Sequence, residues 1–247
     1  MPPRFVEAAV PLLSDPVRAV RIEAARALAG TDLLSLTPEQ QTALVKATAE
    51  LVADEMVDAD RPEAHLNLGL LDLRRRQLPE AENEYRTALR LDPNFVPALV
   101  NFADLERARG RDEEGAELLK KAMAIEPDNA DVQYALGLYL VRKRDYPAAL
   151  DLLRRAHQRV PDNARYAYVY AVALNSSGAS GEAMELLEET QRLHPADRDV
   201  LRALVSFALD KGDFSKALRY ARELVTLSPG DAQLRSLVSD LEKKTAQ

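Results

Sequence analysis

The stretch Ala88-Leu89-Arg90-Leu91-Asp92-Pro93, ALRLDP in one-letter code, decides the fold because it recurs along the chain. Similar phrases follow at intervals of 34 residues, as AMAIEP, AHQRVP, TQRLHP and LVTLSP. Their final prolines are Pro93, Pro127, Pro161, Pro195 and Pro229. Self-similarity at a fixed period of this length predicts a repeat protein in which each repeat is one supersecondary unit.

Working outward from these prolines aligns five repeats without a gap, and residues of one size recur at fixed positions. The repeats start at Pro62, Val96, Ala130, Ala164 and Arg198. Mostly small residues hold position eight (Gly69, Ala103, Gly137, Ala171, Val205) and position twenty (Ala81, Gly115, Ala149, Ala183, Ala217). Mostly bulky residues hold position 24, namely Tyr85, Leu119, Leu153, Leu187 and Ala221. The small positions would let two antiparallel helices approach closely.

A short turn separates the two expected helices of each repeat. Gly110, Gly178 and Gly212 lie where a first helix ends, and glycine suits the left-handed residue that closes many helices. Pro79 and Pro147 suit the first turn of the second helix, where no backbone N–H is needed. The proline at position 32 then ends the second helix.

A 34-residue helix–turn–helix with this pattern resembles the tetratricopeptide repeat, and the resemblance covers residues 62–229. It implies an all-α, right-handed superhelical solenoid whose units are residues 62–95, 96–129, 130–163, 164–197 and 198–229. The family usually has an aromatic residue at position four, where this chain has His65, Leu99, Gln133, Ala167 and Leu201. We expect this departure to change packing detail and not the fold.

Residues 1–30 do not follow the period and resemble a HEAT-type helical pair. We expect one helix at residues 5–13 and a second at residues 14–30. Asp15-Pro16 would start the second helix and Gly30 would end it. A single unit of this kind cannot bury its apolar face alone and must stack on a neighbour.

Residues 31–61 are expected to form a linker and a bridging helix that runs from Thr37 to about Ala59. The residues expected on one side of the bridging helix are Leu44, Val45, Thr48, Leu51, Val52 and Glu55. Residues 230–247 are expected to form a cap helix, with Leu234, Leu237, Val238 and Leu241 on its apolar face. Stacked repeats need such an end piece because the last pair would otherwise expose its apolar side.

Composition excludes several classes of function. The 33 Lys and Arg residues against 40 Asp and Glu residues give a net charge of −7, which disfavours nucleic-acid binding. The chain has no cysteine, so disulfides, thiolate catalysis, Cys-ligated zinc and covalent haem attachment are excluded within it. No apolar run is long enough to suggest membrane insertion, and no signal peptide is recognisable.

No catalytic, cofactor or metal-binding pattern is present, and we expect the chain not to be an enzyme. His65, His157 and His194 stand apart from any zinc-binding spacing and are interpreted as packing or surface residues. The basic runs Arg74–Arg76 and Arg142–Arg144 end first helices, where cations complement the helix dipole.

A partner protein or peptide is expected to bind on the concave face that the resemblance implies for the first helices. Three asparagines would supply hydrogen bonds to a peptide backbone, and Tyr134 and Tyr168 would supply rigid contact area. The predicted contact residues are Leu66, Asn67, Leu70, Asn101, Asp104, Tyr134, Leu138, Arg165, Tyr168, Val172 and Asn175. The Lys–Asn–Arg clamp by which some relatives hold a chaperone's C-terminal carboxylate is absent.

An alternative function is a structural or assembly module that makes intramolecular or homo-oligomeric contacts. The junction LLSDPVRAVRIEAARALAG, residues 12–30, resembles the C-terminal part of bacterial multihaem cytochromes that carry such repeats. That resemblance would place the chain in the periplasm, as the tail of a longer haem protein. Otherwise we expect it in the cytoplasm.

Overall fold

The computed structural model describes residues 3–245, with side chains from residue 5 onward. Helices and the turns between them make up this part of the chain, and no strand occurs in it, which confirms the all-α prediction. The chain divides into two compact units, residues 1–126 and residues 127–247. Each unit is described by itself below.

The first unit begins with a segment that differs in detail from the prediction. Helix α1 spans Pro3–Ala9 and gives way to a 3₁₀ helix, η1, at Val10–Ser14. The single helix predicted for residues 5–13 is therefore wrong beyond Ala9. The cause is Pro11, which lacks the N–H that an α-helical turn would use there.

Helices α2 and α3 form the antiparallel pair of this segment. Helix α2 spans Arg18–Leu28 and starts behind Val17, two residues later than the predicted Asp15-Pro16 start. Its C-cap is Ala29, so Gly30 follows the end of the helix directly, as predicted. A short 3₁₀ turn, η2 at Leu33–Ser35, leads to α3 at Pro38–Glu55 and η3 at Met56–Asp58. Thr37 caps α3 as predicted, in a reciprocal capping box with Gln40. Val45 was expected on the buried side of α3 but is 66% exposed.

Five helix pairs and a final helix follow, and each first helix begins at the first residue of a repeat. In the first unit α4 is Pro62–Arg74, α5 is Leu78–Leu91, α6 is Val96–Ala108 and α7 is Asp112–Ile125. In the second unit the helices are α8 (Ala130–Arg142), α9 (Tyr146–Arg159), α10 (Ala164–Ser176), α11 (Ser180–Leu193), α12 (Arg198–Asp210), α13 (Phe214–Leu227) and α14 (Ala232–Thr245).

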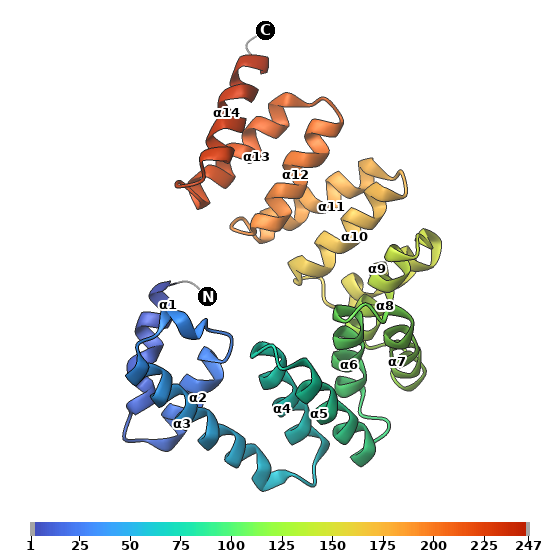
Figure 1. Cartoon of the computed structure of the whole chain (residues 1–247). Coiled ribbons are helices and arrows are strands. Elements are labelled where there is room, and N and C mark those ends of the chain that lie inside the picture. The colour runs from blue at the N-terminus through green and yellow to red at the C-terminus, as the bar shows by residue number, and fades with distance from the viewer. Residues whose placement is uncertain (1–2, 246–247) are drawn as a thin grey trace. The chain divides into compact units, whose positions relative to one another are not determined.

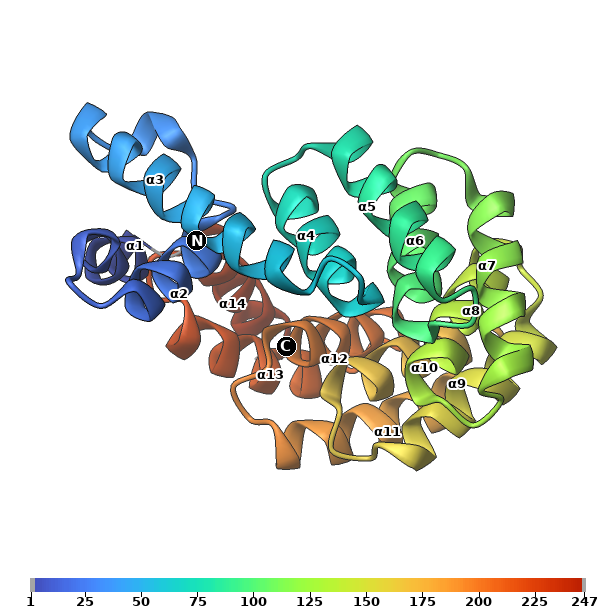
Figure 2. The ribbon, with the colours of Figure 1, turned by 90° about the horizontal axis from the view of Figure 1, so that it is seen from below.

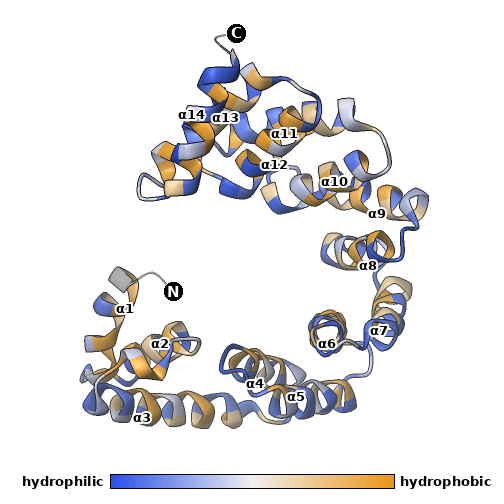
Figure 3. Ribbon diagram, turned by 45° about the horizontal axis from the view of Figure 1, so that its top comes forward, coloured by the Kyte–Doolittle hydropathy of each residue, from blue (hydrophilic) through white to orange (hydrophobic). Residues whose placement is uncertain are grey.

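Within each pair the second helix returns beside the first (Figures 1 and 2). Hydrophobic and hydrophilic residues alternate along the helices (Figure 3), as expected where one face of each helix is buried. The last helix, α14, packs on α13 and buries Leu241, while Arg222 of α13 pairs with Glu242 at 2.7 Å. Helix α14 therefore covers the apolar end of the array.

Each turn within a repeat contains one residue in the left-handed conformation. In three repeats it is the predicted glycine, and in the other two it is an arginine. Gly110, Gly178 and Gly212 have φ values of +77°, +97° and +72°. The equivalent residues of the first and third repeats are Arg76 and Arg144, with φ of 62° and 60°. Each basic run thus ends in an arginine that adopts the left-handed conformation, which is unfavourable for a residue with a Cβ atom.

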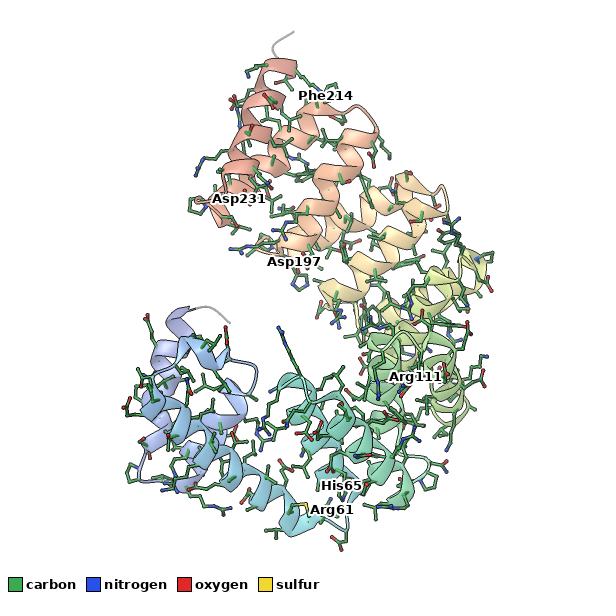
Figure 4. The ribbon with its side chains drawn as sticks, viewed as in Figure 1. Arg61, His65, Arg111, Asp197, Phe214 and Asp231 are labelled. Carbon is green, nitrogen blue, oxygen red and sulfur yellow. The ribbon has the colours of Figure 1, made fainter. Side chains whose placement is uncertain are left out.

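Side-chain caps start the helices at every repeat boundary of the second unit. Asn129, Asn163, Asp197 and Asp231 each accept hydrogen bonds from the backbone N–H groups two and three residues later. Asp197 and Asp231 are labelled in Figure 4. Such caps satisfy N–H groups that a helix start otherwise leaves without partners. In the first unit the cap positions of α4 and α6 are Arg61 and Phe95, whose side chains make no such bond to the described residues.

Close helix approach at the small positions is confirmed by the space around three glycines. A Cβ atom on Gly69 would lie 2.5 Å from the Tyr85 ring, and one on Gly137 would lie 2.8 Å from Leu153. A Cβ on Gly115 would lie 2.8 Å from the carbonyl oxygen of Ala103. Alanine does not fit at these points without movement of a neighbour.

The buried ring of Tyr85 carries a hydroxyl that finds no hydrogen-bond partner among the described residues. Burial, with the charges of Asp104 and Asp72 as smaller causes, raises the pKa of Tyr85 to about 12. Tyr220 of α13 is similarly buried, but its hydroxyl donates to Glu188 at 2.9 Å. The Tyr220 hydroxyl also accepts from the Arg219 guanidinium. The two buried tyrosines therefore differ in whether the hydroxyl has hydrogen-bond partners.

We expect Tyr85→Phe to leave the free energy of unfolding unchanged or slightly higher, because the removed hydroxyl is desolvated and unpaired. We expect Tyr220→Phe to lower it by about 1.5–3 kcal/mol, the range for hydrogen bonds to charged groups, because the hydroxyl bonds to Glu188 and Arg219. Urea unfolding of both variants measures the difference. Equal losses in the two variants would contradict the assignment of Tyr85 as an unpaired hydroxyl.

Candidate partner-binding faces

All eleven predicted contact residues lie on first helices. Helices α4 and α6 of the first unit carry Leu66, Asn67, Leu70, Asn101 and Asp104. Helices α8 and α10 of the second unit carry Tyr134, Leu138, Arg165, Tyr168, Val172 and Asn175. Because α4 packs against α6 and α8 packs against α10, the structure brings the residues together within each of the two groups.

In the first unit, contacts within the chain occupy the predicted polar groups. The Asn67 side chain donates to Glu55 Oε2 of α3 at 3.0 Å. The Asn101 side chain donates to the carbonyl of Pro97, one turn earlier on α6, at 2.8 Å. Asp104 is exposed and lies 3.4 Å from Arg107. Leu66 and Leu70 are half-buried, so the first unit offers few ready hydrogen-bond donors on this face.

In the second unit, Tyr134 serves mainly to join α8 to α10. It is 9% exposed, and its ring stacks on that of Tyr166 with 4.7 Å between the ring centroids. Arg165 Nε donates to the Tyr134 hydroxyl at 2.9 Å, and its guanidinium lies over the same ring. Tyr134 was expected at an exposed position of α8. Its burial leaves little of the side chain available for contact with a partner.

Tyr166 was not predicted, and it completes this inter-repeat cluster. Its hydroxyl donates to Asp131 at the start of α8. Burial first, and then the hydrogen bond to Asp131, raises the pKa of Tyr166 well above its usual value. An aromatic residue at position three of a repeat is the only sequence signal that could have indicated it.

The apolar residues of the face lie farther along the first helices of the second unit. Leu138 is half-buried at the edge of the cluster that contains Tyr134 and Leu153. Tyr168 and Val172 are half-buried at the edge of the neighbouring cluster, against which Leu209 of α12 also packs. Asn175 is also half-buried and follows Val172 by one turn. These side chains combine fixed positions with accessible apolar surface.

Charged residues near the starts of α8 and α12 have partners within the chain. Asp131 accepts from Tyr166, and Arg202 lies 3.5 Å from Asp199 on α12. The described residues include no group of three or more His, Cys, Asp or Glu side chains arranged to hold a metal ion. Within residues 3–245, no helix is both long and apolar enough to cross a membrane.

Two further clusters join helices of the first unit and were also missed by sequence reasoning. Glu106 of α6 is almost fully buried. Its carboxylate accepts two hydrogen bonds from the Arg111 guanidinium, one of them at 2.8 Å. Arg111 also reaches Glu82 of α5 at 3.4 Å (Figure 4). His65 of α4 contacts Glu84 of α5. None of these pairs follows from the repeat period, because each depends on side chains particular to one repeat.

These antiparallel helix pairs, stacked within each unit and carrying a row of residues on their first helices, define a helical-repeat protein. Tetratricopeptide repeat family models match residues 72–139, 134–198 and 181–232, which together make up more than half of the chain. The chain belongs to the tetratricopeptide repeat family.

Relatives share this fold at low sequence identity. The TPR repeat-containing protein YpiA of Bacillus subtilis is 24% identical over 170 residues, which cover 66% of this chain and 40% of YpiA. The chain therefore spans less than half the length of that relative. Among solved structures, PilW, described as a type IV pilus biogenesis factor, superimposes with a TM-score of 0.70 at 18% identity, covering 91% of this chain and all of PilW.

A second solved structure, YrrB, is described as a tetratricopeptide repeat protein with an unusual peptide-binding site. It superimposes with a TM-score of 0.56 at 21% identity and covers 74% of this chain and 93% of YrrB. At these identities both structures show that the fold is shared, and they carry no residue roles across.

Proposed function

We propose that this chain is a non-catalytic scaffold that binds a partner protein or peptide on the first-helix face of its second unit. The row of half-buried apolar residues on consecutive first helices carries the proposal, and Leu138, Tyr168 and Val172 are its centre. A tyrosine and aliphatic side chains held in place by a packed core lose little entropy when they bind.

The first unit supports this role less well, because its asparagine donors already have partners within the chain. Membership of the repeat family and the likeness to a peptide-binding relative add general support for an interaction role. Fold alone does not fix function, so the proposal depends on the side chains of the face.

Selection of binding peptides from a random display library tests the proposal. We expect selected peptides to lose about tenfold or more in affinity for Tyr168→Ala, the loss typical of an aromatic anchor in an interface. Leu193→Ala on α11 is the matched control, because Leu193 is 59% exposed on a second helix. Circular dichroism should show unchanged helix content in both variants.

Two outcomes would contradict this proposal. Selected peptides that bind Tyr168→Ala and wild type equally would place the binding surface elsewhere. A chain that selects no peptides and self-associates with rising concentration in light scattering would favour the assembly role instead.

A further inference from the structure

His65 of α4 joins three segments of the first unit. Its side chain is almost fully buried, and both ring nitrogens point at oxygen atoms of other segments. Nδ1 lies 2.6 Å from Glu84 Oε2 on α5, and Nε2 lies 3.0 Å from the carbonyl oxygen of Ala59. Ala59 belongs to the connection between α3 and α4, residues 56–61. Arg61, at the end of this connection, and His65 are labelled in Figure 4.

Both partners of the ring are hydrogen-bond acceptors. A neutral imidazole carries one N–H and one bare nitrogen, whereas the doubly protonated ring carries two N–H groups. Only the doubly protonated ring donates to both oxygen atoms at once. We infer that His65 is a proton-dependent latch, which fastens the connection at residues 56–61 to the first repeat while both nitrogens carry hydrogen.

Loss of one proton from the His65 ring would remove only one of its two hydrogen bonds. The bond to Glu84 is charge-assisted and short, so the remaining hydrogen is expected to stay on Nδ1. The carbonyl of Ala59 then faces the lone pair of Nε2, and the connection loses that attachment. The apolar contacts of Leu51 with Leu68 and Leu71 hold α3 on α4 in either state, so the change stays local to the connection.

The elements around the latch carry mostly acidic side chains, so counter-charges for a doubly protonated ring are present. In the connection and at the start of α4 these are Asp58, Asp60 and Glu63, with Arg61 placed 3.6 Å from Glu63. Farther along α4 lies Asp72, paired with Arg75 at 3.8 Å. The charged groups at the end of α3 and on the facing part of α5 are Glu55, Glu80 and Glu84.

Amide hydrogen exchange of the whole chain tests the latch, and the inference does not depend on partner binding. The amide of Arg61 donates to the carbonyl of Asp58 at 2.9 Å and reports on the connection. After correction for intrinsic exchange, we expect its protection to fall about tenfold when the pH is raised until the His65 ring loses its second hydrogen, a loss that NMR of the same ring detects. In His65→Gln the protection should not change with pH, and His194→Gln in the second unit should behave like wild type.

Nitrogen-15 NMR of the wild-type ring gives a second readout that needs no variant. We expect both His65 nitrogens to carry hydrogen in the state with the attached connection, and Nδ1 alone to carry it once the second proton is lost. A ring with a single hydrogen throughout, or equal pH dependence of Arg61 protection in wild type and His65→Gln, would overturn the inference.

Discussion

Replacing Leu201 by alanine should lower the free energy of unfolding of the second unit by about 2–5 kcal/mol, the range for large-to-small changes in a core. Leu201 lies on α12, is fully buried, and packs in the cluster that joins α10 to α13. It occupies position four of the last repeat, where the family usually places an aromatic ring. Removing three carbon atoms there leaves a cavity that rigid helix pairs fill only in part.

Leu193→Ala provides the control for this prediction, because Leu193 is 59% exposed at the end of α11. The same chemical change should there stay within about 0.5 kcal/mol of wild type. Urea unfolding followed by circular dichroism measures both variants. Losses of similar size would mean that Leu201 is not part of a close-packed core.

Gly115→Ala should destabilise the first unit by about 1–3 kcal/mol, although alanine is the better helix former. The added Cβ would lie 2.8 Å from the carbonyl oxygen of Ala103, a backbone atom of the facing helix α6. A flexible side chain could turn away, but a backbone carbonyl moves only if α6 and α7 separate. The cost of that separation exceeds the gain of up to about 1 kcal/mol in helix propensity.

Gly181→Ala should change the free energy of unfolding in the opposite direction. Gly181 lies in the first turn of α11, and a Cβ atom there meets nothing within 4 Å. The substitution should raise the free energy of unfolding by up to about 1 kcal/mol, because only the helix propensity changes. Thermal unfolding of the two variants compares the signs directly. A stabilising Gly115→Ala would show that the helices of the second repeat are not in close contact.

The sequence predicted the repeats because the features that define them are local and recur. A proline every 34 residues ends each second helix, and small residues at positions eight and twenty mark where the helices touch. A Cβ atom at Gly69, Gly115 or Gly137 would lie within 3.0 Å of an atom of the facing helix, which is the physical reason that these positions are small. The same regularity identified the turn glycines.

Contacts that occur once could not be predicted, because they depend on side chains that the period does not relate. The stack of Tyr134 on Tyr166 requires residues from different positions of two repeats. The contact of His65 with Glu84 similarly joins position four to position 23 of one repeat. For the same reason the sequence could not indicate that Tyr134, expected at an exposed position, is 9% exposed. The predicted contact residues stay a prediction.

The segment before the repeats was predicted least well, since no second copy was present to compare it with. The 3₁₀ helix that contains Pro11 interrupts the first predicted helix. Val45 is exposed, although it was expected on the same side of the bridging helix as the buried Leu44 and Leu51. The HEAT-like character of residues 1–30 and the likeness to multihaem proteins stay predictions. So do the predicted domain limits and the compartment.

The caps at repeat boundaries make the second unit modular. The first helix of each of its repeats follows an Asn or Asp cap, and each second helix ends just before a proline, so every repeat boundary carries the same stop and start signals. Excision of residues 164–197 would join Asn163 to Arg198, and Asn163 would then cap the helix that Asp197 caps now. An array built in this way can gain or lose whole repeats during evolution without a new boundary having to arise.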